Sequence, residues 1–345
     1  MTMYRSPLLD LPGAVPADPP DAGVAAHYGD PIREQRLISG GEGWVDLSHR
    51  SVVRISGADR LSWLHNLTTQ RLTTLAVGVG ADALVLSPQG HVEHHLQLVD
   101  DGESTWIHVE PGSAEPLVGF LESMRFMLRV EVVDVTAEWA VVWQPICALL
   151  PEFVTRVDPQ ADAVAGRQVF VPRDRLTEFV SGAGPAVGVQ ALEALRVEAG
   201  RPRFGLETDH RTIPHELGWI GSAVVLDKGC YRGQETVAHV ANLGRPPRRL
   251  VRLHLDGSVR ETLPERGSEI FADGVGVGRL TSAAYHHELG PIGLALLKYM
   301  TPDGEVVVGA GEAGVSASIE SIVERDDSPR PGQAARSALR GRSLL

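Results

Sequence analysis

The chain has 345 residues, of which 43% are hydrophobic and 22% charged, and its net charge is −12. This length and composition predict a folded protein of two or three domains. No run reaches the roughly 18–20 apolar residues that cross a membrane, and an acidic chain is a poor partner for nucleic acid. With only two cysteines, Cys147 and Cys230, the chain cannot form a disulfide-rich scaffold or, by itself, a four-cysteine metal site.

Both ends of the chain differ in composition from its middle. Residues 1–25 are rich in proline, glycine and aspartate and lack a long apolar run after a basic start. We therefore expect a flexible leader, not a signal peptide, and a cytoplasmic protein. Residues 326–345 contain several arginines, and we expect a disordered basic tail. We expect neither direct nucleic-acid binding nor membrane contact.

Strands and helices alternate through the first two thirds of the body. Polar–apolar alternation marks the strands, and leucines at helical spacing mark the first helix. The predicted elements, in chain order, are strands over 44–57, a helix over 57–70, three strands over 81–109, a helix over 115–130, strands over 130–144 and 167–172, a helix over 192–200, a strand over 218–226 and a helix over 230–244.

A glycine- and proline-rich hinge at residues 242–247 separates a different C-terminal part. Residues 248–325 contain short strand-like runs divided by glycine turns, which are typical of an antiparallel barrel or sandwich. We therefore predict an α+β protein with domains over residues 26–145, 146–245 and 246–325. We expect the glycines at 274, 276 and 278 to form β-turns because no strand–helix unit surrounds them.

The stretch DKGCYRGQETVAH (227–239) contains one of the two cysteines. If a helix begins at Cys230, its N-terminus, Lys228 and Arg232 would stabilise a thiolate. The alternative is a small buried thiol that packs like alanine or serine. Gly229 and Gly233 allow close backbone approach under either reading.

Glu198 lies in LEALRVEAG, at the edge of an apolar helix face that contains Leu192 and Leu195. We expect Arg196 to point elsewhere. A partly buried carboxylate needs hydrogen-bond donors, which a local backbone or arginine could supply. The alternative donor is a ligand with an edge like that of an aminopyrimidine.

Histidines cluster at HVEHH (91–95) and, more weakly, at residues 286–287. On a strand, His91, Glu93 and His95 would share one face, and His94 would point the other way. Two histidines and a carboxylate can bind a metal, but the spacing of the known helical zinc motif is missing. We expect exposed or hydrogen-bonded histidines and no metal site.

Two motifs together carry a family resemblance. LEALRVEAGRPRFGLE and DKGCYRGQETVAHV resemble the YgfZ branch of the folate-binding, GcvT-like proteins. R-x-E-A-G is shared with the glycine cleavage T-protein, an aminomethyltransferase, whereas K-G-C-Y-x-G-Q-E is typical of the YgfZ branch. WVDLSHRSVVRISGADRLSWLHNLTTQ also resembles the start of T-proteins, so the likeness runs from about residue 40 to 325.

The resemblance implies a ring of two α+β domains and a C-terminal β-barrel around a channel that binds tetrahydrofolate. Glu198 would receive the pterin edge, and Arg249 would meet the glutamyl carboxylate. Lys228 and Tyr231 would lie at the cofactor, and Cys230 would be the reactive thiol.

The resemblance also implies a function and an alternative. The leading prediction is a tetrahydrofolate-binding accessory protein for the assembly or repair of iron–sulfur enzymes, with iron–sulfur client or assembly proteins as partners. A link to tRNA modification would be indirect, through iron–sulfur tRNA-modifying enzymes. The alternatives are a tetrahydrofolate-dependent aminomethyl or methyl transferase, and a binding module whose cysteine is only structural.

One departure from the T-protein pattern bears on this choice. T-proteins have G-G-x-x-D-D where this chain has QGHVEH (89–94). Only Glu93 could replace the catalytic carboxylate, and its longer side chain would shift the charge by about a bond length. An error of about 1 Å can cost roughly 100-fold in rate, so we do not expect glycine-cleavage activity.

Overall fold

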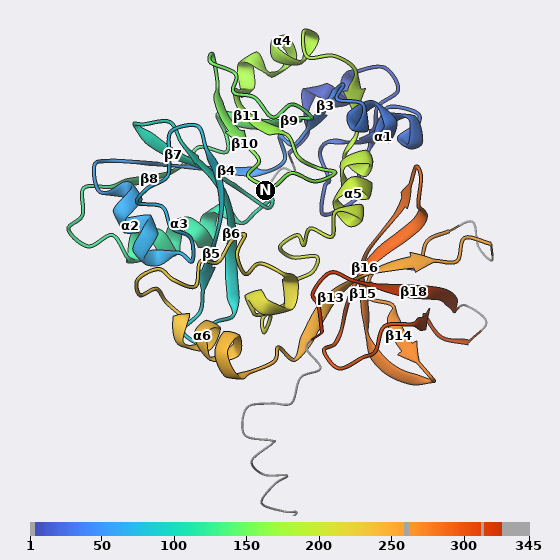
Figure 1. Ribbon diagram of the computed structural model, residues 1–345. Helices are drawn as coiled ribbons and strands as arrows, with labels where there is room; N and C mark the ends of the chain where they lie inside the picture. The colour runs from blue at the N-terminus through green and yellow to red at the C-terminus, as the bar shows by residue number, and fades with distance from the viewer. Residues whose placement is uncertain (1–3, 259–261, 312–313, 326–345) are drawn as a thin grey trace, which may run out of the picture.

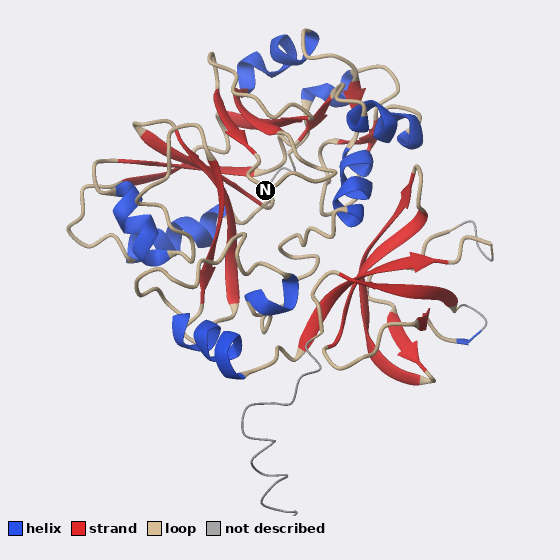
Figure 2. Ribbon diagram, viewed as in Figure 1, coloured by secondary structure: helices blue, strands red, loops and turns tan. Residues whose placement is uncertain are grey.

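The structure is a computed structural model that describes residues 4–258, 262–311 and 314–325 (Figure 1). Two five-stranded sheets with helices lie beside a closed six-stranded barrel (Figure 2). This is the α+β architecture with a C-terminal barrel that the sequence predicts. No helix in the described ranges is long and apolar enough to cross a membrane. The predicted disordered tail over 326–345 lies outside the described residues.

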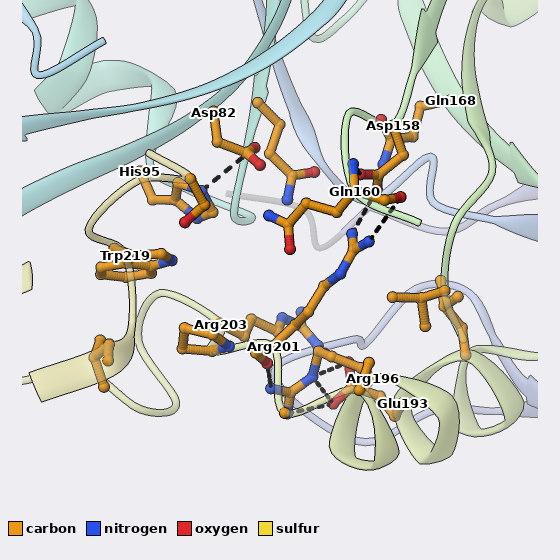
Figure 3. Close-up of a pocket in the computed structure, with 18 of the residues that line it drawn as sticks. Asp82, His95, Asp158, Gln160, Gln168, Glu193, Arg196, Arg201, Arg203 and Trp219 are labelled. Atoms are coloured by element: carbon orange, nitrogen blue, oxygen red, sulfur yellow. Dashed lines mark hydrogen bonds and ion pairs between the residues drawn. The ribbon is translucent and has the colours of Figure 1, made fainter. Parts of the chain in front are cut away.

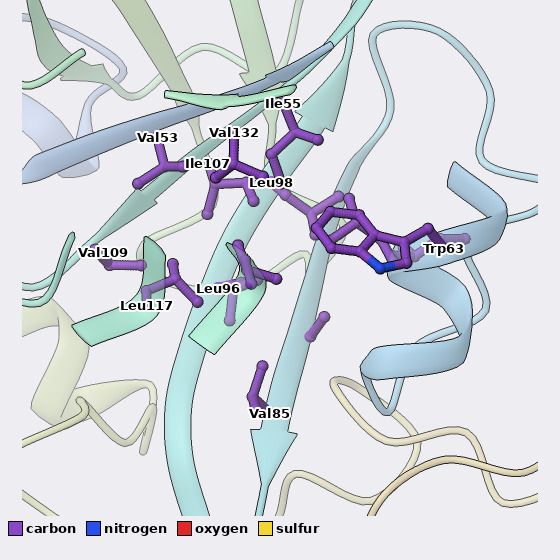
Figure 4. Packing of buried hydrophobic residues seen from close by; sticks show 14 of the residues in the cluster. Val53, Ile55, Trp63, Val85, Leu96, Leu98, Ile107, Val109, Leu117 and Val132 are labelled. Atoms are coloured by element: carbon purple, nitrogen blue, oxygen red, sulfur yellow. The ribbon is translucent and has the colours of Figure 1, made fainter. Parts of the chain in front are cut away.

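The first sheet has the antiparallel order β5-β6-β7-β4-β8. Its strands are Ser51–Ser56 (β4), Gly80–Leu86 (β5), Val92–Asp100 (β6), Ser104–Val109 (β7) and Glu131–Asp134 (β8). Helices α2 (Arg60–Leu67) and α3 (Ala114–Ser123) cover one face of it. Leu96 and Leu98 from β6 pack there against Trp63 and Leu117 from the helices (Figure 4). The opposite face of β6 is therefore free to carry polar residues.

The second sheet has the order β10-β11-β9-β3-β12. Its strands are Trp44–Asp46 (β3), Trp139–Gln144 (β9), Val154–Val157 (β10), Arg167–Pro172 (β11) and Ala186–Val187 (β12). Its helices are α1 (Pro31–Ser39), the 3-10 turn η2 (Arg173–Arg175), α4 (Leu176–Ser181) and α5 (Val189–Glu198). β12 is parallel to β3, and the other pairs are antiparallel.

The sheets do not follow the predicted division at residue 145. β3 precedes the first sheet in the chain but pairs with β9, which follows it. The strands of the first sheet are therefore inserted, in the sequence, between two strands of the second. β9, predicted to end the first domain, is central in the second sheet. The sequence could not reveal this arrangement. The chain passes from the second sheet to the first after β3 and back before β9, and neither connection has the glycine- and proline-rich composition of a hinge.

The predicted flexible leader over 1–25 is wrong for residues 4–25. A 3-10 turn η1 (Pro7–Asp10) and strands β1 (Val15–Pro16) and β2 (Ala25–His27) are formed. Leu8 is 1% exposed and packs with Trp44, and the Ser6 hydroxyl donates to Asp46 at 2.5 Å. These contacts are tertiary, so local composition could not reveal them.

The barrel closes in the order β13-β16-β15-β14-β17-β18, which confirms the predicted barrel. Its strands are Arg248–Leu255 (β13), Glu269–Ala272 (β14), Val275–His286 (β15), Gly290–Lys298 (β16), Glu305–Val308 (β17) and Val315–Ser321 (β18). Alternate side chains such as Val251, Leu253 and Leu280 fill its interior.

Residues 199–247 connect α5 to the barrel with little regular structure. They hold a 3-10 turn η3 (Pro214–Leu217) and helix α6 (Gln234–Leu243). The predicted strand over 218–226 is wrong: this segment has one isolated bridge, between Ile220 and Val224. Trp219, Ala223 and Val224 of this segment are buried against β5 and β6 instead. The helix predicted over 115–130 ends at Ser123, where a loop follows.

Candidate functional site

The central cavity, about 270 Å³ in volume, lies between the two sheets and α5 (Figure 3). Strands β5, β6 and β7 of the first sheet, β11 of the second, and the segment after α5 all contribute to its wall. The polar and aromatic side chains that line it are Arg50, Asp82, His95, Gln97, His108, Glu110, Asp158, Gln160, Gln168, Glu193, Arg196, Arg201, Arg203, Trp219 and Ser222. The cavity is thus polar and enclosed by fixed elements.

Asp82 on β5 is the carboxylate on the first-sheet side of the cavity. It accepts from Arg156 at 2.9 Å and lies 3.6 Å from His95. Burial alone would raise the pKa of Asp82, but the Arg156 guanidinium and His95 outweigh it and hold the pKa well below its usual range. Asp82 is therefore a carboxylate at neutral pH, and a ligand's N–H groups can donate to it.

Neutral hydrogen-bonding groups lie beside Asp82. Gln97 and His108 are register partners on β6 and β7, and both line the cavity. Gln168 on β11 accepts from Arg156 through its amide oxygen at 2.6 Å. His95 stacks against Trp219 with ring centroids 5.0 Å apart (Figure 3). This wall offers hydrogen-bond donors and acceptors beside two aromatic rings.

Arginines and carboxylates form the opposite side of the cavity. Arg203 reaches Asp21 at 2.6 Å, Glu110 at 2.8 Å and Glu193 at 3.2 Å. Burial would lower the pKa of Arg203, but Glu110, Glu193 and Asp21 outweigh it and raise the pKa. Arg196 binds Glu193 at 3.0 Å as well. These charges satisfy one another and tie the first residues of the chain to α5.

Helix α5 presents Glu193 and Arg196 to the central cavity, and Glu198 lies elsewhere. Glu198 lines a second cavity of about 380 Å³, between α1, α5 and the β15–β16 turn. There its carboxylate is 3.2 Å from His286. As expected, Arg196 points elsewhere than Glu198, but it is buried and lines the central cavity, which Glu198 does not share. The role predicted for Glu198 in pterin binding stays a prediction.

Cys230 is exposed and lies four residues before α6, which begins at Gln234 after the N-cap Gly233. The sequence predicts Cys230 at or just before a helix N-terminus; it lies before the helix, which begins four residues later than the predicted start at residue 230. The alternative of a small buried thiol is wrong, because the side chain is on the surface. Cys230 lines neither the central nor the second cavity.

Lys228 anchors the loop that carries Cys230. Its ammonium donates to the carbonyls of Thr68 at 2.6 Å, Gln70 at 3.0 Å and His65, at the end of α2. Burial, with a smaller contribution from Arg71, lowers the pKa of Lys228 to about 8. The Lys228 ammonium is hydrogen-bonded to these backbone carbonyls and does not line the central cavity. A cofactor bound in that cavity would therefore not contact it.

Tyr231 and Arg249, the other predicted binding residues, also lie away from the central cavity. Tyr231 is 7% exposed and packs in the apolar cluster with Val237. Arg249 is fully buried and binds Asp303 at 2.5 Å and the Ser321 hydroxyl at 2.6 Å. The structure therefore does not bring the five predicted site residues together, and their predicted roles remain untested.

The side chains of the HVEHH cluster (91–95) point to different surroundings. His94 lies near Phe120, and burial together with Arg232 lowers its pKa to about 4. Glu93 pairs with Arg232 at 2.7 Å, and His95 faces the central cavity. Within the described ranges, no group of three or more histidine, cysteine or acidic side chains could hold a metal ion.

Sequence reasoning missed the residues that shape the central cavity, above all Asp82, His108, Gln168 and Glu193. Asp82 and His108 are single polar residues inside the apolar runs ADALVL and WIHV, and Gln168 follows Arg167 at the start of the apolar run RQVFV. A polar residue at a buried strand position needs a partner, and this is the one signal that could have selected them.

Comparison with known proteins shows what the chain is similar to. Residues 248–321 match the model of the glycine cleavage T-protein C-terminal barrel domain. The crystal structure of the glycine cleavage system aminomethyltransferase T from Bartonella henselae superposes with a TM-score of 0.75 at 19% identity, over 92% of this chain and 95% of that one. The chain has the fold of the glycine cleavage T-protein. The predicted GcvT-like fold is confirmed.

Sequence relatives agree with this fold. The chain is 25% identical to an aminomethyltransferase of Chromobacterium violaceum over 315 residues, covering 81% of this chain and 85% of the relative. It is 26% identical to a putative chloroplastic transferase of Arabidopsis thaliana over 318 residues, covering 81% and 71%. The similarity to GcvT-like aminomethyltransferases is thus confirmed, and the YgfZ branch within them stays a prediction.

Proposed function

We propose that this T-protein-fold chain binds a reduced folate, with the pterin ring in the central cavity, and serves as an accessory protein for the assembly or repair of iron–sulfur enzymes. The observation that carries the folate assignment is the set of hydrogen-bonding groups that line the central cavity. Asp82, Gln97, His108 and Gln168 converge on one volume. The likeness to aminomethyltransferases in fold and sequence supports the choice of ligand class.

The residues present fit a pterin. Its aminopyrimidinone edge carries adjacent N–H donors, which match the oxygens of a carboxylate such as Asp82. The carbonyl and ring nitrogens of the same edge need neutral partners, which Gln97 and His108 supply. The volume of about 270 Å³ is at the low end for ligand sites, so the ring fits inside and the benzoyl-glutamate tail extends outside.

The alternative, a folate-dependent aminomethyl or methyl transferase, has the names of the relatives in its favour. The position of Glu93 argues against it. Glu93 is the residue that could replace the catalytic carboxylate of T-proteins, yet it pairs with Arg232 at 2.7 Å and does not line the central cavity. An accessory role that requires binding without aminomethyl transfer accounts better for this arrangement.

The loop around Cys230 supports a role for its thiol. Lys228 caps α2, Tyr231 packs in a core, Arg232 pairs with Glu93, and Gly233 contacts the β5–β6 turn. Each of these neighbours has a structural use. Cys230 is exposed and contributes to none of those contacts, so a rigid loop presents its sulfur to solvent. We propose that it meets the iron–sulfur client.

Calorimetric titration with 5-formyltetrahydrofolate tests the folate assignment. Wild type should bind, and Gln160→Trp, which fills the cavity from a loop position, should lose at least about tenfold in affinity, roughly 1.4 kcal/mol. Absence of heat with wild type at millimolar ligand would contradict folate binding.

A cellular assay tests the accessory role. In cells that lack the protein, Cys230→Ser should restore iron–sulfur enzyme activities no better than an empty vector, whereas Cys147→Ser, at the other exposed cysteine, should restore them fully. Full rescue by Cys230→Ser would contradict the role proposed for the thiol. Steady turnover of an aminomethyl donor with tetrahydrofolate would favour the transferase.

A further inference from the structure

His108 is a buried imidazole that the fold leaves unsatisfied at the wall of the central cavity. It lies on β7 and is 2% exposed, and neither ring nitrogen makes a hydrogen bond of good geometry with a described residue, although the Gln168 side chain lies close enough to interact weakly. Buried polar side chains in folded proteins are nearly always paired. An orphaned imidazole that lines a cavity therefore indicates that a bound molecule completes its hydrogen bonds.

We infer that His108 is a specificity-determining residue of the central cavity, where it recognises a neutral lactam or amide edge of a heterocyclic ligand. The inference rests on the proposed folate binding and goes beyond it, because it names the side chain that reads the ring and the ligand class that it accepts. A lactam presents one N–H and one C=O side by side. A neutral imidazole has one donor and one acceptor nitrogen, and either can pair with such an edge.

The surroundings of His108 keep it neutral. Burial lowers its pKa well below the ordinary value, and Arg156 and Arg50 lower it further, while Asp82 and Gln168 offset this only in part. Neutral imidazole cannot pair as a cation with a carboxylate or phosphate. His108 therefore meets a ligand with one N–H donor and one acceptor nitrogen, not as a cation.

Two neighbouring amides extend the same neutral surface. Gln97 faces His108 across the β6–β7 pair and lines the cavity. The Gln168 oxygen accepts from Arg156 at 2.6 Å, which orients its amide and leaves the NH₂ group as a donor. Three neutral polar groups from three strands thus lie beside the Asp82 carboxylate, and together they match the edge of a neutral ring.

Matched variants of His108 test this inference. His108→Phe keeps a planar ring and removes both nitrogens, whereas His108→Asn keeps a donor and an acceptor. The probe is 6-methyltetrahydropterin, which has the ring edge without the glutamyl tail, followed by calorimetry. We expect wild type and His108→Asn to bind within a few-fold of each other, and His108→Phe to bind at least about tenfold more weakly. The free His108→Phe protein should melt at a higher temperature than free wild type.

A spectroscopic measurement separates a ligand contact from a structural role. The ¹⁵N resonances of the His108 ring should shift when the pterin is added and keep the pattern of a neutral imidazole. If His108→Phe binds the pterin like wild type and the ring resonances do not move, the inference is overturned while folate binding stands. If wild type binds neither the pterin nor 5-formyltetrahydrofolate, the proposed function fails and the inference fails with it.

Discussion

Glu193 and Glu198 belong to the same helix, α5, yet they face two different cavities. Glu193 lines the central cavity and pairs with Arg196 at 3.0 Å and Arg203 at 3.2 Å. Glu198 lies 3.2 Å from His286, at the contact between α5 and the barrel. Five residues along a helix turn the side chain by about 140°, so one helix can serve both cavities.

This arrangement predicts different effects for two equivalent substitutions on α5. Glu193→Gln should weaken 5-formyltetrahydrofolate binding by about tenfold, because it removes the carboxylate charge that Arg203 and Arg196 share at the cavity wall. Glu198→Gln should bind within about twofold of wild type. Calorimetric titration of both variants measures the difference. The opposite order would place the pterin at Glu198 and exclude the central cavity as its site.

Gly233 and Gly229 predict a second contrast, within the cysteine loop. A Cβ on Gly233 would lie 2.5 Å from the Ser87 carbonyl oxygen, and its φ of +81° is unfavourable for other residues. Gly229 differs from Gly233 in both respects. Nothing lies within 4 Å of its Cβ position, and its φ is not positive. Gly233→Ala should lower the free energy of unfolding by about 2–3 kcal/mol. Gly229→Ala should change it by less than about 1 kcal/mol, and urea denaturation measures both.

Lys228 predicts how firmly the same loop is held. Lys228→Met keeps most of the side-chain length but leaves the carbonyls of His65, Thr68 and Gln70 without their shared donor. We expect a loss of about 1–3 kcal/mol in the free energy of unfolding. Limited proteolysis should then cut near residue 229 in the variant before wild type is cut. Equal cleavage of the two proteins would show that the ammonium does not anchor the loop.

The barrel and several helices were predictable because their patterns are local. Glycine turns divide residues 248–325 into short strands, and the helix over 192–200 ends before Gly200, whose φ of +66° suits a helix C-terminus. The burial of Leu8 and the pairing of β3 with β9 depend on distant residues instead. No local signal encodes either contact.

The candidate site was predicted less well, for a related reason. The sequence identifies Glu198 and Cys230 through motifs, whereas the central cavity is built from isolated polar residues such as Asp82 and His108 on strands of the first sheet. The ion-pair partners of its polar residues determine which side of α5 faces the central cavity. Glu207, after the helix, pairs with Arg196 at 3.0 Å and holds that side inside.

Buried histidines predict the pH dependence of stability. Burial lowers the pKa of His215 to about 4, and burial with Arg232 does the same for His94. Both are neutral in the native state and bind protons more readily when unfolded. Their contribution, on the order of 1 kcal/mol each once solvent screening of these partly buried groups is considered, is therefore present above pH 6.5 and is lost as the pH falls from about 6.5 to 4.

Thermal melts from pH 7 to pH 4 test this dependence. Wild type should lose stability steadily over that range, and the double variant His94→Gln, His215→Gln should lose less. His239→Gln, at an exposed position on α6, should follow wild type. An unchanged slope in the double variant would assign the acid sensitivity to other groups. Aspartates with lowered pKa, such as Asp209, lose their contribution only below about pH 4.

The most direct measurement for the central claim is a crystal structure of the protein with 5-formyltetrahydrofolate bound. We predict that the pterin ring lies between Asp82 and His108 in the central cavity, with its glutamyl tail outside. Density for the pterin at Glu198 and His286, or a ligand-free central cavity at saturating folate, would contradict the proposed site.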